Sequence, residues 1–374
     1  MKKKKIVISG VNMVDSGILT IFREVVTTFS KKSNVDIICL VNNKELFVDI
    51  YNNNVSFVEY KGIKSSWIKR LYFEFVYSFF LSMKLKPDAW VCLHDISANI
   101  YNTHQFVYCH NPSPFYSSNW KDWRMDKKFF LFTMFYKYLY RINIRKNKAI
   151  IVQQTWMANR FSEWFDVNNI IVSKPEVKFN LICGKKKNTG DGRVRLIYPA
   201  VPRVFKNMEA LIDAFIYIKN NAKDVYKKTE ILLTFDRGMT QYGDEIIKCC
   251  EENGLDNIKF IGYQSKADLN DKYSSVVDAL IFPSKLETWG LPISEAKMYG
   301  LPIIAINMDY AKETVGDYSA VTFFDSNCEN SLANVIIKYV RKDIVFEGNA
   351  SVKSSWHELY NFDELAEYII NNAK

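Results

Sequence analysis

The sequence lacks the features that mark several large classes of protein. No apolar run in its 374 residues reaches the ~18 uncharged residues that a membrane span needs. The apolar run after MKKKK ends at Ser9 and Gly10, so it predicts a first strand and not a secretion signal. The seven cysteines are scattered without a C-x-x-C pair, which indicates a reducing cytoplasm and no disulfide framework.

Common metal, cofactor and nucleic-acid motifs are also missing. The four histidines show no H-E-x-x-H or similar spacing, which argues against a metal site built on them. The first strand-to-helix loop, VNMVDSGILT, contains Gly17 but no G-x-G-x-x-G fingerprint, which disfavours a nicotinamide-dependent enzyme. The net charge is +9, but no helix-turn-helix, zinc-finger or RNA-recognition signature accompanies it, so we expect no nucleic-acid partner.

The positive charge is concentrated in the first half of the chain. Residues 1–180 contain 26 Lys and Arg against 14 Asp and Glu, whereas the remainder contains 24 against 27. Segments 67–80 (WIKRLYFEFVYSFF) and 115–148 mix aromatic residues with cations. Such apolar stripes usually face a core, but a helix on an anionic membrane surface uses both features. We keep both interpretations, on opposite faces of the same helices.

Alternating strand-like and helical segments predict an α/β protein with two Rossmann-like, doubly wound domains that face a cleft. We expect strands at residues 4–9, 35–41, 89–93, 105–108 and 149–152, and at 194–198, 230–235, 258–261, 279–282 and 303–305. The expected domains are residues 1–182 and 190–352, with a polar linker at 181–193. The last segment, 353–374, has apolar residues at roughly helical spacing and predicts a C-terminal helix.

The most informative segment is residues 282–305, FPSKLETWGLPISEAKMYGLPIIA. Glu287 follows a short apolar run that predicts a buried strand, and Glu295 lies in a predicted helix with Pro292 in its first turn. Carboxylates accept hydrogen bonds from sugar and ribose hydroxyls, and free N–H groups at a helix start attract phosphate. The pattern predicts a seat for a polyhydroxylated, phosphorylated ligand. For either glutamate alone, the alternative is a solvent-exposed charge.

The whole string resembles the E-x7-E signature of retaining GT-B glycosyltransferases of family 4, roughly F-P-S-x-x-E-x-[FW]-G-[LI]-P-x-x-E-A-x-x-x-G-x-P-[VI]-[VI]-A. The resemblance implies the GT-B fold, with an acceptor-binding first domain, a nucleotide-sugar-binding second domain and a C-terminal helix that crosses back to the first. It also implies transfer with retention of configuration from a UDP- or GDP-sugar, without a cofactor or a metal. The absence of any D-x-D triplet fits a metal-independent enzyme.

The same resemblance implies roles for the donor-binding residues. Glu295 would hold the ribose hydroxyls, and Glu287 would hold the donor sugar. Lys206, in YPAVPRVFKN, matches the lysine of the family's K-N pair and would neutralise the leaving diphosphate, together with the N–H groups near Gly290 and Leu291.

Other site residues match the family less closely. The family's partner arginine usually lies a few residues earlier, where Val201 stands, so Arg203 is expected to replace it. His110, in CHNPSP, matches a His-x-Pro element that would hydrogen-bond the sugar or order the acceptor. Trp289 occupies the [FW] position, and Gly17 lies where the family often has Gly-Gly near the donor.

We therefore expect a hexosyltransferase that acts in bacterial O-antigen, capsule or lipopolysaccharide assembly. The basic aromatic first domain suggests a glycan acceptor linked to polyprenyl diphosphate, and a protein peripheral to the cytoplasmic face of the inner membrane. A non-catalytic, membrane-associated GT-B partner subunit is one alternative, although Lys206, Glu287 and Glu295 are all present. A nucleotide-sugar epimerase is another, and the E-x7-E string argues against it.

Overall fold

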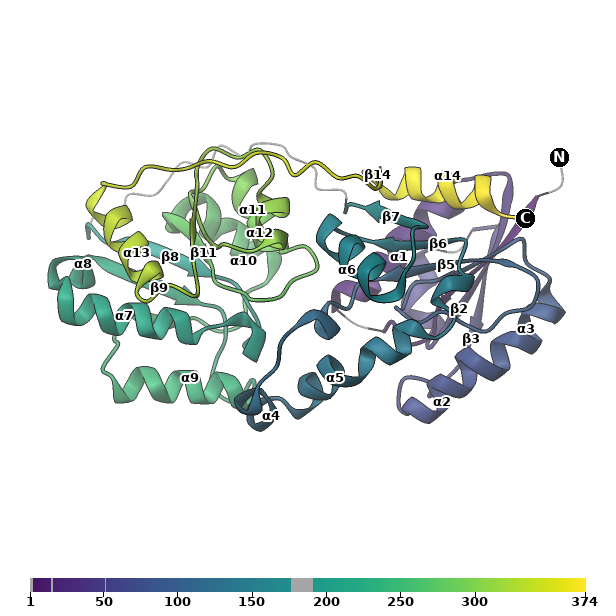
Figure 1. Ribbon diagram of the computed structural model, residues 1–374, viewed down its shortest axis with the longest axis horizontal. Helices are drawn as coiled ribbons and strands as arrows, with labels where there is room; N and C mark the ends of the chain where they lie inside the picture. Colours follow the sequence, from purple (N-terminus) through teal and green to yellow (C-terminus); the bar gives the residue numbers. More distant parts are fainter. Residues whose placement is uncertain (1–2, 15, 51, 176–190) are drawn as a thin grey trace. The chain divides into compact units, whose positions relative to one another are not determined.

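The computed structural model describes residues 3–14, 16–50, 52–175 and 191–374. The described chain divides into two compact units (Figure 1). The first contains residues 1–114, 134–176 and 354–374, and the second contains residues 115–133 and 177–353. Most of the expected linker at 181–193 lies outside the described residues.

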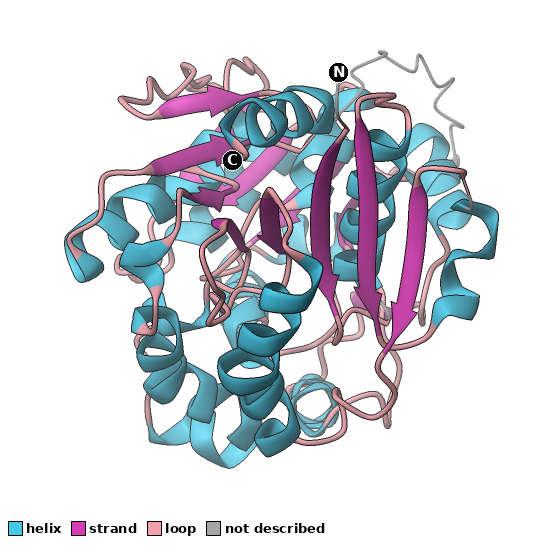
Figure 2. Cartoon of the chain, turned by 90° about the vertical axis from the view of Figure 1, so that its right-hand side faces the viewer, coloured by secondary structure: helices cyan, strands magenta, loops and turns pink. Residues whose placement is uncertain are grey.

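The first unit is built on an eight-stranded parallel sheet in the order β14-β7-β6-β5-β4-β1-β2-β3. The strands are β1 (Lys4–Gly10), β2 (Val35–Val41), β3 (Val55–Glu59), β4 (Ala89–Cys92), β5 (His104–Cys109), β6 (Ala149–Val152), β7 (Ile170–Ser173) and β14 (His357–Leu359). Figure 2 shows strands of this sheet side by side and pointing the same way. The central strands AWVC and AIIV are buried throughout, as expected when helices cover both faces of a parallel sheet.

Helices of the first unit lie in the crossovers between its strands, except α14, which follows the last strand. They are α1 (Ser16–Ser30), α2 (Trp67–Tyr72), α3 (Ser78–Leu85), most of α5 (Lys127–Arg141), α6 (Thr155–Phe165) and α14 (Phe362–Asn372). A π turn, Phe73–Tyr77, joins α2 to α3, so residues 67–85 form one continuous helical run. Helix α1 packs against α14. Phe22, Leu365 and Ile369 from these two helices belong to the buried core.

The second unit has a six-stranded parallel sheet in the order β10-β9-β8-β11-β12-β13. Its strands are β8 (Val194–Tyr198), β9 (Thr229–Leu233), β10 (Ile258–Phe260), β11 (Ala279–Phe282), β12 (Ile303–Ile306) and β13 (Val321–Phe324). Its helices are α4 (Trp120–Met125), α7 (Glu209–Asn221), α8 (Lys223–Lys228), α9 (Gln241–Glu252), α10 (Lys266–Asp271), α11 (Leu291–Met298), α12 (Asp309–Val315) and α13 (Ser331–Arg341). The strand order reverses between β8 and β11, and ligands of such sheets bind beside that point, outside the carboxyl ends of the strands.

The end of the chain is not the single helix that its apolar spacing predicts. His357–Leu359 form β14, which pairs in parallel with β7. Helix α14 begins only after Asn361, whose side chain accepts a hydrogen bond from the Glu364 N–H and so caps the helix. The Trp356 Nε1 donates to Asn159 at 2.8 Å. Residues 354–374 therefore cluster with the first unit through an edge strand as well as a helix.

Residues 115–133 cluster with the second unit, although they lie inside the range 1–182 expected for the first domain. The Lys121 Nζ lies 3.1 Å from a carboxylate oxygen of Glu209, and the rings of Phe129 and Phe205 are 4.9 Å apart. Helix α5 consequently begins in the second unit and ends in the first. These long-range contacts leave no periodic signal in the sequence.

Candidate active site

Lys206 and Glu287 meet at the carboxyl end of the sheet in the second unit. Lys206 lies on the loop after β8 and Glu287 on the loop after β11, and these two strands are neighbours. The Lys206 Nζ is 2.5 Å from the Glu287 Oε1, and the two side chains are 17% and 15% exposed. A phosphate or a sugar hydroxyl that reaches this pair meets a cation and an anion that are both already held in place.

Backbone contacts hold these two loops together. The Lys285 N–H donates to the Phe205 carbonyl at 2.7 Å, and the Asn207 Nδ2 donates to the Pro283 carbonyl at 3.1 Å. Asn207 follows Lys206 with a φ of +54°, a left-handed conformation that Asn adopts more readily than most residues. The K-N pair thus has a structural reason: the asparagine turns the chain and anchors it beside β11.

Gly290 begins helix α11 with a φ of +85°. A Cβ at this position would make only ordinary contacts, 3.4 Å from the Phe282 ring and 3.5 Å from Ile293, so it is the positive φ that favours glycine. The Ile293 N–H donates to the Gly290 carbonyl at 2.9 Å, which is the first turn of the helix. The N–H groups of Gly290 and Leu291 precede that bond and lie at the positive end of the helix dipole.

Glu295 and Trp289 are fixed by polar contacts around the same helix. The Tyr273 hydroxyl donates to the Glu295 Oε2 at 3.3 Å. Burial raises the pKa of the Glu295 carboxyl, and the hydrogen bond from Tyr273 acts in the opposite direction. The Trp289 Nε1 donates to the Ser294 Oγ at 2.9 Å, and the Thr314 hydroxyl donates to the Trp289 carbonyl. The loop from Glu287 to Gly290 is therefore bonded through Trp289 to both α11 and α12.

Arg203 is engaged by a residue that sequence reasoning missed. Its Nε donates to the Asp126 Oδ2 at 2.6 Å, and its guanidinium lies 5.8 Å from the centre of the Phe205 ring. The Asp126 Oδ1 also accepts from the Phe129 N–H at 3.0 Å, so Asp126 caps α5. The position of Asp126 just before a helix predicts that it caps that helix, but nothing in the sequence predicts its pairing with Arg203. The structure thus compensates the charge of Arg203 within the protein.

His110 lies at the end of β5 in the first unit and is oriented by Asp95. The Asp95 Oδ1 accepts from the backbone N–H groups of His110 at 2.7 Å and Asn111 at 3.0 Å, and the His110 Nε2 lies 3.6 Å from the Asp95 Oδ2. The hydroxyls of Tyr136 and Tyr140 donate to the same carboxylate at 3.3 and 3.2 Å. Asp95 follows β4 in the string LHDIS, and no motif pointed to it.

Gly17 lies in the first turn of α1 and is exposed. A Cβ added there would meet no atom within 4 Å. The packing of the protein itself therefore does not require a glycine, and its role in approaching the donor stays a prediction.

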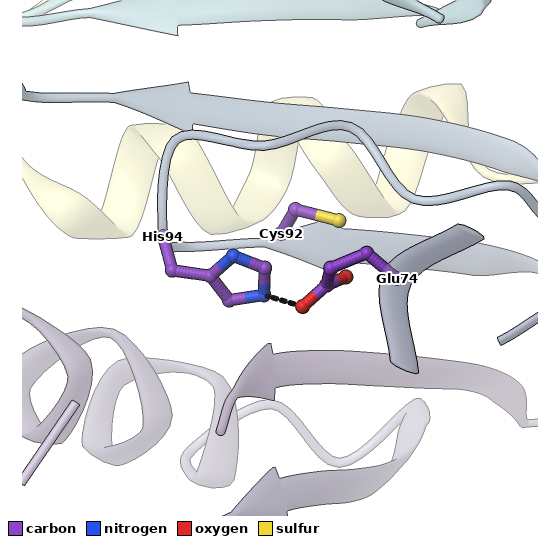
Figure 3. A group of neighbouring side chains, drawn as sticks. All are labelled: Glu74, Cys92 and His94. Carbon is purple, nitrogen blue, oxygen red and sulfur yellow. Dashed lines mark ion pairs between the residues drawn. The ribbon is translucent and has the colours of Figure 1, made fainter. Parts of the chain in front are cut away.

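One group of side chains among the described residues has the donor atoms for a metal ion. Atoms of Glu74, Cys92 and His94 lie within 4.8 Å of one another, and all three residues are buried (Figure 3). The His94 Nε2 is 3.3 Å from the Glu74 carboxylate and 3.1 Å from the Ser9 Oγ. Burial raises the pKa of Glu74 to about 8, although the positive charge of Arg70 opposes this shift. Because Arg70 already acts on the carboxyl, we interpret the cluster as a polar network of the core.

The structure thus brings Lys206, Glu287, Gly290 and Leu291 together at one edge of the second unit's sheet, with Trp289 and Glu295 on the attached loop and helix. His110 and Gly17 belong to the first unit.

Known proteins match part of the chain in sequence. Residues 184–352 match the family model described as glycosyl transferases group 1. The O-antigen chain mannosyltransferase B of Escherichia coli is 26% identical over 164 residues, which are 43% of this chain and 38% of that protein. The matched part therefore spans less than half the length of this curated relative.

Solved structures match nearly the whole chain in fold. HepE from Anabaena, crystallised with UDP and glucose, has a TM-score of 0.61 at 14% identity, over 98% of this chain and 95% of that one. A glycosyltransferase from Rickettsia africae has a TM-score of 0.64 at 14% identity, over 100% and 94%. These likenesses confirm the predicted fold class, in which two Rossmann-like α/β units form a GT-B protein.

Proposed function

We propose that this protein is a retaining glycosyltransferase that moves a sugar from a nucleotide diphosphate to a hydroxyl of a lipid-linked glycan. The observation that carries the proposal is the Lys206–Glu287 pair at 2.5 Å beside the start of α11, at the carboxyl ends of β8 and β11. The match of residues 184–352 to glycosyl transferases group 1 supports it.

Two of these residues bind the donor, and the others stabilise the charge that develops on the diphosphate. Glu295 accepts hydrogen bonds from the ribose hydroxyls, and Glu287 accepts them from the donor sugar. As the bond between the anomeric carbon and the phosphate oxygen breaks, negative charge grows on the diphosphate. Lys206, with the N–H groups of Gly290 and Leu291, stabilises that charge without a metal. Arg203 joins them when a donor draws it from Asp126.

The new bond forms between the acceptor oxygen and the anomeric carbon on the face that the diphosphate leaves. The departing phosphate takes the proton of the acceptor hydroxyl, so atoms and charges balance without a protein nucleophile. His110 hydrogen-bonds sugar hydroxyls or orders the acceptor, and Asp95 holds its backbone through the His110 N–H. The UDP and glucose in HepE and the O-antigen role named for the E. coli relative favour a nucleoside diphosphate donor and a surface-glycan acceptor.

The proposed acceptor is linked to a membrane lipid, because the helical run 67–85 exposes apolar residues and buries polar ones. No helix in the described residues is long and apolar enough to cross a membrane. Four residues at steps of four are buried: Arg70, Glu74, Ser78 and Ser82. Seven apolar residues are exposed: Trp67 at 39%, Ile68 at 81%, Tyr72 at 59%, Val76 at 42%, Tyr77 at 36%, Phe80 at 63% and Met83 at 43%. A helix on a protein surface in water has the reverse pattern, so this face is suited to lipid.

Helix α5 also exposes apolar residues and cations, but unlike the run 67–85 it buries mainly aromatic side chains. Phe129, Thr133, Tyr136 and Tyr140 are buried, whereas its exposed apolar residues are Leu131, Met134, Phe135 and Tyr138. Lys127 and Lys128 are exposed on the same helix, and cations of this kind are attracted to anionic lipid headgroups. Segments 67–80 and 115–148 are thus the proposed contact with the cytoplasmic face of the inner membrane.

The donor assignment is tested by thermal unfolding of the purified protein with millimolar UDP, GDP or ADP. A nucleotide at a hundred times its dissociation constant adds about 2.7 kcal/mol of stability. We expect one nucleotide to raise the unfolding midpoint and Glu295→Gln to lose most of that rise. Transfer from the matching nucleotide sugar to a polyprenyl-diphosphate-linked acceptor, with the anomeric configuration of the product read by NMR, tests the reaction. If no nucleotide shifts the midpoint, the donor site is wrong.

A further inference from the structure

A groove of about 590 Å³ lies beside helix α2 in the first unit, between the loop after β3 and the start of the run 67–85. Its lining residues are Glu59, Tyr60, Lys61, Ile63, Ile68, Lys69, Tyr72, Phe73 and Tyr77. Its volume is within the ~300–1,000 Å³ that is usual for small-ligand sites. Neither the donor site nor the network around His110 uses these residues.

The floor of the groove is aromatic and preformed. The Tyr60 ring lies 4.9 Å from Phe73 and 5.6 Å from Tyr77, and the Phe73 and Tyr77 rings are 5.5 Å apart. The wall is unusually exposed, since Ile68 is 81% and Tyr72 is 59% accessible. Large apolar side chains held open around a hollow indicate a binding surface for an apolar ligand.

The rim of the groove is cationic. Its lining contains two lysines, Lys61 and Lys69, and both are exposed. The one carboxylate in the lining, Glu59, already accepts from the Lys44 N–H at 3.2 Å and lies 3.3 Å from the Lys61 Nζ. Lys69 adds an exposed ammonium on the first turn of α2. An apolar ligand that enters here therefore meets positive charge at the edge, which fits an anionic head on an apolar chain.

We propose that this groove binds the polyprenyl part of the acceptor: the first isoprene units lie on Tyr60, Phe73 and Tyr77, and the diphosphate lies against Lys61 and Lys69. The proposal rests on the proposed function, because it names where the lipid of that acceptor is held. A branched isoprenoid chain suits a groove lined by aromatic and aliphatic side chains, and two neighbouring phosphates suit two lysines. The membrane-facing residues Val76, Phe80 and Met83 continue the same helical run away from the groove, so the lipid can leave the bilayer directly into it.

Farnesyl diphosphate, a soluble short polyprenyl diphosphate, is the probe, and isothermal titration calorimetry measures its affinity for the whole protein. We expect Ile68→Asn and Lys69→Gln each to weaken binding about tenfold or more. Val345→Asn and Lys84→Gln are the matched controls, since both residues are exposed and neither lines the groove. Farnesol and inorganic diphosphate should each bind much more weakly than the complete probe.

Equal affinity of all four variants, or binding of inorganic diphosphate as tight as that of the probe, would overturn the proposal. So would a probe that binds only when phosphatidylglycerol vesicles are present, because that result assigns the surface to bulk lipid. Unfolding midpoints of each variant show that it is folded. The nucleotide-dependent shift of the unfolding midpoint, measured on the same preparations, distinguishes failure of the groove proposal from failure of the proposed function. If nucleotides bind and the probe does not, the groove assignment is wrong and the donor-site assignment is unaffected.

Discussion

At the scale of single residues, the Lys206–Glu287 pair is the feature with the largest chemical consequence. Each side chain has lost most of its contact with water, and the partner compensates its charge. Removing either partner leaves the other as an uncompensated, largely buried charge, so substitution of either residue should disturb the site.

We expect Lys206→Met to lower the rate of transfer by about 100- to 1,000-fold, because a positive charge near a leaving group stabilises the transition state by that order. Glu287→Gln should also reduce transfer, with a rise in the KM for the donor sugar. Lys338→Gln, on the exposed surface of α13, is the control and should leave the rate unchanged. Wild-type rates in the Lys206 variant would remove this lysine from the donor site.

Glu74 predicts a pH dependence of stability. Burial raises its pKa from 4.5 to about 8, so the folded state holds a proton that the unfolded state releases above its own lower pKa. The contribution of Glu74 is complete at low pH and is lost as pH rises between those two values, by on the order of a few kcal/mol. Burial also lowers the pKa of His94, which adds the opposite slope at acidic pH.

Glu74→Gln removes the first of these two effects. We therefore expect the variant to gain stability relative to the wild type as pH rises from 5 to 8, measured by urea unfolding at each pH. Glu163→Gln, at an exposed site in α6, should show no such trend. A constant difference between Glu74→Gln and the wild type across this range contradicts the raised pKa.

The residues of the donor loop were predictable because their signal is local. Glu287, Gly290 and Glu295 lie within nine consecutive positions, where a strand end, a positive φ and a helix start fix their spacing. Asp95 and Asp126 were not predictable as partners of His110 and Arg203. They lie 15 and 77 residues from those partners in sequence, and only the folded chain joins them.

At the scale of elements, the helical run 67–85 is the most unusual part of the molecule. The sequence stripe of Trp67, Leu71, Phe75 and Phe79 suggests a core face, yet none of these four is buried, and four of the five buried positions of the run are polar. Tertiary partners explain this: the Arg70 Nη2 donates to the His94 carbonyl at 2.7 Å, and the Tyr101 N–H donates to the Ser82 Oγ at 2.8 Å. Periodicity alone cannot show that such partners exist.

The exposed face of this run predicts a contribution to membrane binding. Phe80→Asn should weaken co-sedimentation with anionic vesicles by roughly tenfold, since moving a Phe side chain into an apolar phase is worth about 1.5–3 kcal/mol. Stability in solution should change by no more than about 0.5 kcal/mol, because the residue is on the surface. Val345→Asn, at an 83% exposed site in the second unit, is the matched control. Equal loss in both variants contradicts a specific membrane face.

The sequence predicts the central strands of both sheets more accurately than the C-terminal segment. The ten expected strands are present within two residues of the predicted ends, because runs such as VDIICLV are apolar and rich in β-branched residues. Strands β3, β7, β13 and β14 were not expected. Strand β14 has only three residues, and its place at the edge of the sheet depends on pairing with β7.

At the scale of the whole molecule, the reaction should need no metal. The lysine and the helix start supply the positive charge that a divalent ion supplies in other transferases. We expect transfer to proceed at the same rate after dialysis against EDTA. The nucleotide-dependent shift of the unfolding midpoint should also be unchanged. A tenfold loss that added Mg²⁺ restores would contradict the metal-independent mechanism.

The uneven charge of the chain predicts that its membrane binding depends on salt. Residues 1–180 hold 26 Lys and Arg against 14 Asp and Glu, whereas the rest holds 24 against 27. The Debye length falls from about 10 Å at 0.1 M to about 3 Å at 1 M salt, so attraction to anionic lipid weakens across this range while apolar contacts remain. Vesicles with phosphatidylglycerol should bind strongly and lose most of that binding at high salt, whereas phosphatidylcholine vesicles should bind weakly at all salt concentrations. Binding that is equal for both lipids would assign the contact to the apolar face alone and leave the basic half to another partner.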